Sequence, residues 1–201
     1  MKTNKQAIVR LVGTAIFAAL VIVLQVFVVI PLPGGFTITL TMVPIIVGAI
    51  LFGPAAGAFL GGVFGAVVSV QVVTGLMGLY SFMMFEQSPV LTVLVCLLKG
   101  IVAGWVAGWL YKLLSAKNKN QLGVILAAVA APICNTGIFV IALATIFNNL
   151  VSTWVLENAY ENMITFLLFF MVGANFLVEF AVNVILIPVV TRVLAAVKAK
   201  F

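Results

Sequence analysis

Residues 90–114 read VLTVLVCLLKGIVAGWVAGWLYKLL, an apolar run in which the only charged residues are Lys99 and Lys112. A helix of about 20 apolar residues crosses the hydrocarbon core of a bilayer, because each residue advances it by about 1.5 Å. We therefore predict a transmembrane helix here. A soluble domain of similar size could not hide such runs, because much of its surface must face water.

The rest of the chain has the same character. Of its 201 residues, 65% are hydrophobic and 7% are charged, against roughly 25% charged in an ordinary soluble domain. Six apolar runs are found, at residues 8–30, 42–52, 56–74, 90–114, 122–147 and 163–197. Polar or turn-rich loops are expected between them. The sequence predicts one all-α integral membrane domain over residues 1–201, with six transmembrane helices.

The placement of charge predicts the orientation. If the N-terminus is cytoplasmic, six crossings put both termini and every basic residue except Lys99 on the inside, and leave Glu86, Glu157 and Glu161 outside. This distribution agrees with the positive-inside rule. We interpret the net charge of +6 as a topology signal and a set of contacts with membrane lipid, and not as a nucleic-acid site.

Several enzyme classes lack their residues in this chain, which contains no histidine and no aspartate. A Ser-His-Asp triad, an HExxH zinc site and a Walker-B aspartate are therefore excluded, and no phosphate-binding GxxxxGK[ST] motif is found. A Ser–Lys dyad would be the main remaining route for an intramembrane enzyme, but no serine has an evident pairing with Lys99. We predict no catalytic residue, metal ligand or cofactor, and a role in binding or transport.

Two ionisable residues, Lys99 and Glu179, lie deep in apolar runs, where a charge costs at least a few kcal/mol. Each is separated by about 20 Å of helix from a basic residue at the predicted cytoplasmic edge. Asn135 reaches nearly the same depth. Three polar groups from three helices at one level indicate one site in the outer half of the membrane.

The last apolar run carries a polar face, because Asn175, Glu179 and Asn183 are spaced i, i+4 and i+8. Two interpretations are open. In the first, Lys99 and Glu179 form a structural salt bridge that locks two helices together. In the second, they line a pocket open toward the outside, in which Lys99 binds a substrate carboxylate and the other polar residues bind hydroxyls or amides. The two interpretations can coexist.

The predicted outer loops have features of a lid. Residues 31–41 are rich in Gly, Pro and Thr, and residues 77–85 are rich in Met and Phe, whose flexible methionines suit a gate that repacks. Trp154 and Tyr160 are expected to be anchors at the membrane interface. The candidate lid residues are Gly34, Gly35, Phe36, Met83 and Phe85.

Small residues at four-residue spacing allow helix backbones to approach closely in a membrane. Two glycine stripes, expected to serve internal packing, and one alanine pair have this spacing: Gly57, Gly61 and Gly65; Gly100, Gly104 and Gly108; Ala15 and Ala19.

The chain resembles the substrate-binding S-components of energy-coupling factor (ECF) vitamin transporters. The likeness rests on about 200 residues, six spans, a short basic loop between spans four and five, and the run at residues 41–57, TMVPIIVGAILFGPAAG, with its Phe-Gly-Pro turn. The segment Ala15-Ile-Phe-Ala-Ala19 is similar to the Ala-x-x-x-Ala pattern by which such proteins dock on the coupling subunit.

The resemblance implies a multi-pass protein of a bacterial plasma membrane. It would bind a vitamin from outside and topple in the membrane to release it inside. The implied partners are a membrane-embedded coupling (T) subunit and two cytoplasmic ATPase subunits, which would use the ATP.

The vitamin is inferred from the buried charges. A small hydroxylated carboxylate fits Lys99 and the asparagines, so pantothenate is favoured, with folate and cobalamin as alternatives. A stand-alone secondary transporter is a further alternative, although no internal repeat is evident.

Overall fold

A computed structural model of the chain describes residues 2–32, 36–189 and 191–192. Gly34 and Gly35 lie outside the described residues. The elements, in chain order, are α1 (Lys2–Phe27), β1 (Val29–Leu32), β2 (Phe36–Thr39), α2 (Met42–Phe52), α3 (Pro54–Val73), α4 (Leu79–Gln87), α5 (Pro89–Ser115), α6 (Asn120–Thr145), α7 (Asn148–Glu157), α8 (Met163–Thr165), a π-helix η1 (Phe166–Val172) and α9 (Gly173–Ile185).

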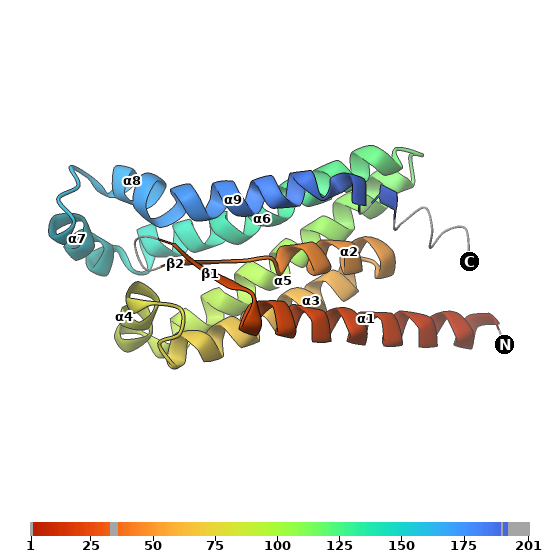
Figure 1. Cartoon of the computed structure of the whole chain (residues 1–201), viewed down its shortest axis with the longest axis horizontal. Helices are drawn as coiled ribbons and strands as arrows, with labels where there is room; N and C mark the ends of the chain where they lie inside the picture. Colours follow the sequence, from red (N-terminus) through yellow and green to blue (C-terminus); the bar gives the residue numbers. More distant parts are fainter. Residues whose placement is uncertain (1, 33–35, 190, 193–201) are drawn as a thin grey trace.

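The long helices run roughly along the long axis of the molecule, with the start of α1 and the end of α9 at the same end (Figure 1). Four helices are long and apolar enough to cross a membrane, and residues 42–52 and 176–189 form shorter apolar helices. The prediction of several helices able to cross a membrane is therefore confirmed. The six crossings remain a prediction, because the 11 residues of α2 span only about 16 Å.

The two glycine stripes face each other across the contact between α3 and α5. A Cβ atom built on Gly61 would overlap the carbonyl oxygen of Gly100, and one built on Gly104 would overlap the carbonyl oxygen of Gly57. The backbones thus touch directly, as small residues in membrane helices allow. Both stripes serve internal packing, as expected. They fix the position of α5, the helix that carries Lys99.

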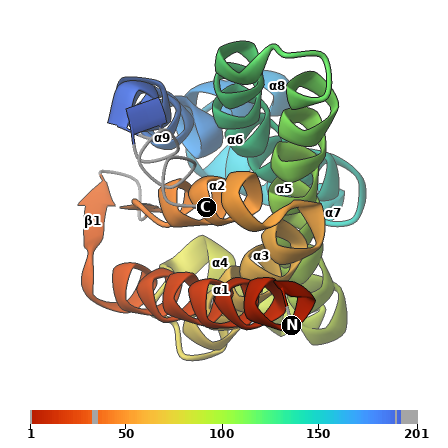
Figure 2. The same ribbon diagram turned by 90° about the vertical axis from the view of Figure 1, so that its right-hand side faces the viewer.

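Helix α2 lies in the middle of the bundle, between α1 on one side and α6 and α9 on the other (Figure 2). Its residues Ile45 and Ala49 have no exposed surface. The predicted Gly-Pro turn follows: Gly53 adopts a φ of 93°, and Pro54 begins α3. Arg10 of α1 closes this end, because its Nε donates to the Phe52 carbonyl oxygen at 2.6 Å and its Nη2 donates to the same oxygen.

The first predicted loop contains an antiparallel hairpin in which Val29 pairs with Thr39 and Leu32 with Phe36. The alternating apolar and threonine residues before α2 are typical of such a strand.

The other two outer connections were predicted to be loops. This prediction was wrong, because they contain the helices α4 and α7. These helices form one end of the molecule (Figure 1). The prediction that Trp154 anchors the interface was also wrong. Its side chain is fully buried, and its ring packs edge-on against Tyr80 at 4.8 Å between centroids. Burial of this large aromatic residue holds α7 in place, which the local sequence alone does not reveal.

The last predicted span is not one continuous α-helix. It consists of α8, the π-helical η1 and α9, with a turn at Leu186 before a helical stretch to residue 189. A π-helix pairs residues five apart and so inserts an extra residue into the turn. Hydrophobicity does not reveal this insertion, since every residue of η1 is apolar.

Candidate functional site

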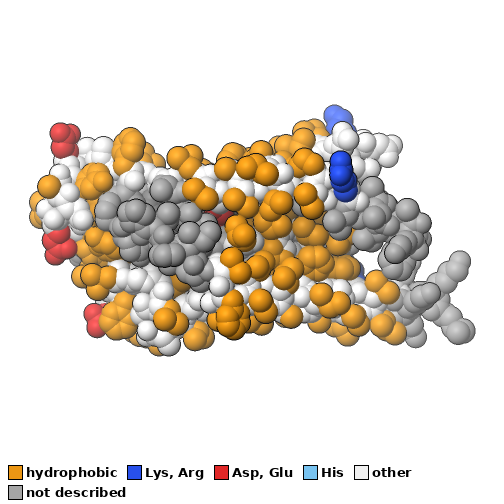
Figure 3. All heavy atoms as spheres, in the orientation of Figure 1, with side chains coloured by type: hydrophobic (Ala, Val, Ile, Leu, Met, Phe, Trp, Pro, Cys, Tyr) orange, Lys and Arg blue, Asp and Glu red, His pale blue; other side chains and the backbone are white. Residues whose placement is uncertain are grey.

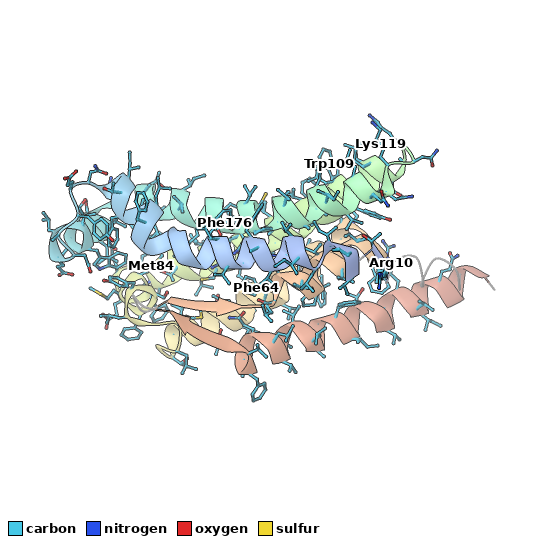
Figure 4. The ribbon with its side chains drawn as sticks, turned by 45° about the horizontal axis from the view of Figure 1, so that its top comes forward. Arg10, Phe64, Met84, Trp109, Lys119 and Phe176 are labelled. Atoms are coloured by element: carbon cyan, nitrogen blue, oxygen red, sulfur yellow. The ribbon has the colours of Figure 1, made fainter. Side chains whose placement is uncertain are left out.

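Lys99 projects from α5 toward two aromatic rings of neighbouring helices. Its ammonium nitrogen lies 5.0 Å from the ring centroid of Phe139 on α6 and 5.9 Å from that of Phe64 on α3, and Phe64 lies in the middle of the bundle (Figure 4). An ammonium group over the face of an aromatic ring is attracted by the quadrupole of the ring. Lys99 therefore points into the bundle and not toward lipid.

Glu179 on α9 is half-buried and lies close enough to Lys99 for the two charges to attract each other. No direct ion pair joins them among the residues that the structure describes. The predicted salt bridge is thus not seen, but the two charged residues lie near each other, as predicted. The Lys99 ammonium has the two rings as its contacts and no carboxylate of the described residues bonded to it.

Two of the predicted asparagines have a buried side-chain oxygen that accepts no described hydrogen bond. Asn135 is 8% exposed and Asn183 is 3% exposed, and the Oδ1 atom of each is buried without a described partner. A buried polar atom without a partner costs about 1–3 kcal/mol. Asn135 lies one helical turn from Phe139, which contacts Lys99, so the two residues share one face of α6.

Asn183 lies one turn from Glu179 and donates from Nδ2 to its main-chain oxygen at 2.9 Å. It also lines a small cavity of about 10 Å³ between α2, α6 and α9, which has room for about one water molecule. The cavity is lined by Val43, Ile46, Val124, Ala128, Asn183 and Leu186. The structure thus brings Asn183 to Glu179 and Asn135 to the surroundings of Lys99, while the side chain of Asn175 lies outside the described residues.

The candidate lid residues are only partly described. The side chain of Phe36, at the start of β2, is outside the described set. Met83 and Phe85 on α4 are half-buried and pack against two different apolar clusters: Met83 against the cluster around Trp154, and Phe85 against the central one. They connect the end of the molecule formed by α4 and α7 to its core, and their role as a gate stays a prediction.

A family model described as ECF transporter, substrate-specific component, matches residues 9–191. The chain belongs to this family. Membership makes it a multi-pass membrane transport subunit and not an enzyme, and implies association with ECF T and ATPase subunits and a vitamin substrate. No curated protein matches the chain.

Apart from Lys99 and Glu179, the charged side chains that Figure 3 shows gather at opposite ends of this S-component, with Lys and Arg at one end and acidic side chains at the end formed by α4 and α7. The predicted separation of charge is thus observed. Which end faces the cytoplasm stays a prediction.

The alanine pair of the S-component is accessible. Ala15 and Ala19 are both exposed on a helix that lies at the edge of the bundle (Figure 2). Neighbouring residues of the same face, such as Leu11 at 73% exposed, are also open. The pair is therefore not used for packing within the described part of the chain, and its predicted role in docking keeps its physical basis.

A polar cluster that the sequence prediction missed joins α1, α3 and the residue before α2. Gln25 donates from Nε2 to Gln71 Oε1 at 2.8 Å, and Gln71 Nε2 donates to the Gln25 main-chain oxygen at 3.0 Å. Thr41 Oγ1 donates to Gln25 Oε1 at 3.1 Å. All three residues are buried. Single glutamines inside apolar runs are the signal in the sequence that could have predicted this cluster.

Proposed function

We propose that this S-component binds a small anionic vitamin, with pantothenate favoured, between α5, α6 and α9. The observation that carries the proposal is the position of Lys99, a cation that faces the bundle with two phenyl rings and no bonded carboxylate among the described residues. A cation–π contact is worth about 2 kcal/mol when desolvated. A carboxylate forms a charge-assisted hydrogen bond with an ammonium group and is the stronger partner.

The remaining groups favour a ligand with both polar and apolar parts. The free Oδ1 of Asn135 would accept a hydrogen bond from a hydroxyl or amide of the ligand, which relieves the cost of a buried acceptor. Phe64 and Phe139 would pack against its carbon skeleton. Glu179 supports the same choice, because its proximity to Lys99 keeps the cation in place while the site is empty. Pantothenate has the carboxylate, hydroxyls and amide that such a site needs.

Release into a bacterial cytoplasm would follow docking on the T subunit through Ala15 and Ala19, with energy from the ATPase subunits. Docking at α1 leaves Lys99 and its neighbours untouched, because α1 contributes none of these residues. Vitamin binding and subunit docking are then separate properties of the S-component, and they can be measured separately.

The proposal is tested by equilibrium binding of radiolabelled pantothenate, folate and cobalamin to the purified S-component in detergent. Wild type is expected to prefer pantothenate. Lys99→Met, which keeps the length of the side chain without its charge, is expected to weaken binding by at least tenfold, since hydrogen bonds to charged groups contribute about 1.5–3 kcal/mol. Lys112→Met, an exposed lysine of the same helix, is the matched control and should bind as wild type does.

Equal affinities of wild type and Lys99→Met for the preferred vitamin would overturn the placement of the anion at Lys99. Preference for a cationic or uncharged vitamin would overturn the substrate class.

A further inference from the structure

Two tryptophans on α5 lie side by side on the outer surface of the molecule. Trp105 is 47% and Trp109 is 45% exposed, and their rings stack with centroids 6.1 Å apart and planes at 12°. Because the third tryptophan, Trp154, is fully buried, this pair holds all the exposed indole surface of the chain. Neither α3 nor α6 covers it, so it faces the surroundings of the protein.

Lys112 completes the same face. The spacing of Trp105, Trp109 and Lys112 is i, i+4 and i+7, which places the three side chains in one row along a helix. Lys112 is exposed and lies in the last turn of α5. The row therefore passes from an apolar aromatic surface to a cation at the end of the transmembrane helix.

The end at which Lys112 lies is electropositive. Lys117 and Lys119 are exposed in the following turn, and α6 begins at Asn120, so the positive end of the α6 helix dipole lies beside them. Figure 4 places Trp109 and Lys119 together at one edge of the bundle, across the molecule from α1. The docking helix and the tryptophan row thus lie on different sides of the S-component.

We propose that the face formed by Trp105, Trp109 and Lys112 is a binding site for an anionic phospholipid in the leaflet at the basic end of the molecule. The stacked indoles would lie along an acyl chain and the glycerol region, where tryptophan is enriched because its ring is apolar and its N–H is polar. The lysine stem would follow the same chain and carry the ammonium group to the phosphate.

The choice of an anionic lipid over a protein partner rests on charge and position. A negative headgroup matches the lysines and the N-terminus of α6, whereas Glu86 of α4 and Glu157 of α7 lie at the opposite end of the molecule (Figure 1). The proposal does not depend on the identity of the vitamin, because the row shares no residue with the Lys99 site.

The test uses tryptophan fluorescence of the S-component alone in phosphatidylcholine nanodiscs. One set of nanodiscs contains a minor fraction of brominated phosphatidylglycerol, and the other contains the same fraction of brominated phosphatidylcholine. Bromine quenches an indole on contact, and buried Trp154 supplies a constant background. We expect stronger quenching by the anionic lipid in wild type. Lys112→Gln should reduce that preference by about fivefold, the contribution of one lysine near an anionic surface.

Lys119→Gln is the matched control, since it removes one charge from the same end but outside the row, and it should retain most of the preference. A second measurement does not rely on the reporter: native mass spectrometry should find retained phosphatidylglycerol on wild type and lose it on the Trp105→Leu/Trp109→Leu variant. Equal quenching by both lipids, or equal loss in the two lysine variants, would overturn the site. Emission that changes only when the T subunit is added would assign the row to a protein interface and also overturn it.

Discussion

The contact between α3 and α5 allows a sharp prediction, because two adjacent glycines of α3 have different surroundings. A Cβ atom at Gly61 would overlap the main chain of Gly100 and Ile101, whereas one at Gly62 would meet the Ile101 side chain at 3.5 Å, an ordinary contact. A backbone atom cannot rotate away as a side chain can. Gly61→Ala therefore forces the two helices apart, and Gly62→Ala does not.

The magnitudes follow from this difference. Alanine stabilises a helix by about 1 kcal/mol relative to glycine, and this gain applies to both variants. Overpacking costs about 1–3 kcal/mol, and the rigid backbone at Gly61 favours the upper end of that range. We expect Gly61→Ala to lower the free energy of unfolding by about 2 kcal/mol and Gly62→Ala to raise it by up to about 1 kcal/mol. The difference of about 3 kcal/mol corresponds to about 6–12 °C in Tm for a chain of this size.

The assay is thermal unfolding of both variants and wild type in the same detergent. Gly61→Ala should also weaken vitamin binding, because Gly100 follows Lys99 and a displaced α5 moves the ammonium group away from Phe64. Midpoints of the two variants within about 2 °C of each other would refute the proposed backbone contact. A normal vitamin affinity in a destabilised Gly61→Ala would refute the link between this contact and the site.

Two further predictions concern α1 and its contact with α3. Ala15→Trp should reduce uptake of radiolabelled vitamin into vesicles that contain the T and ATPase subunits by at least an order of magnitude while leaving binding in detergent intact. Leu20→Trp, which lies about 140° around the helix from Ala15, should retain uptake. Loss of uptake in both variants would mean that any bulky residue on α1 is harmful. Gln71→Leu should lower the free energy of unfolding by about 1–3 kcal/mol, because it removes the oxygen acceptor of the buried Gln25 Nε2 and the donor to the Gln25 main-chain oxygen. The double variant Gln25→Leu/Gln71→Leu should lose less than the sum of the single losses in thermal unfolding, because no amide is then left alone; additive losses would contradict the hydrogen-bonded pair.

Those parts of the fold that depend on physical constraints from the bilayer could be predicted from the sequence. Apolar length predicted the long helices, and the cost of a buried charge predicted that Lys99 faces inward. The glycine stripes predicted a close helix contact, although they could not show that α3 and α5 pair with each other. Each of these predictions uses a property of a single helix.

Features that depend on several helices could not be predicted in the same way. The cluster of Gln25, Thr41 and Gln71 forms only because the ends of three segments meet. In the sequence, each of these residues is a single polar residue in or beside an apolar run, and nothing links it to the other two. Trp154 was assigned to the interface because tryptophan is common there, but its burial depends on Tyr80, which is distant in sequence. For the site, the sequence indicated the charges and asparagines, but not the two phenyl rings that hold the ammonium group.

The attachments of α1 determine how a force on its exposed face is transmitted. Near one end of the helix, Arg10 is bonded to the Phe52 carbonyl oxygen, and near the other, Gln25 is bonded to Gln71. These attachments are about 22 Å apart along the helix, and Ala15 and Ala19 lie between them. The Gln25–Gln71 bond is buried and is expensive to break without water to replace it, and the Arg10 bond is strengthened by the charge of the guanidinium group. A partner that pulls on the alanine pair would therefore turn the whole bundle, since peeling α1 away would require both attachments to open. This geometry favours release by rigid-body reorientation of the S-component over movement of its first helix.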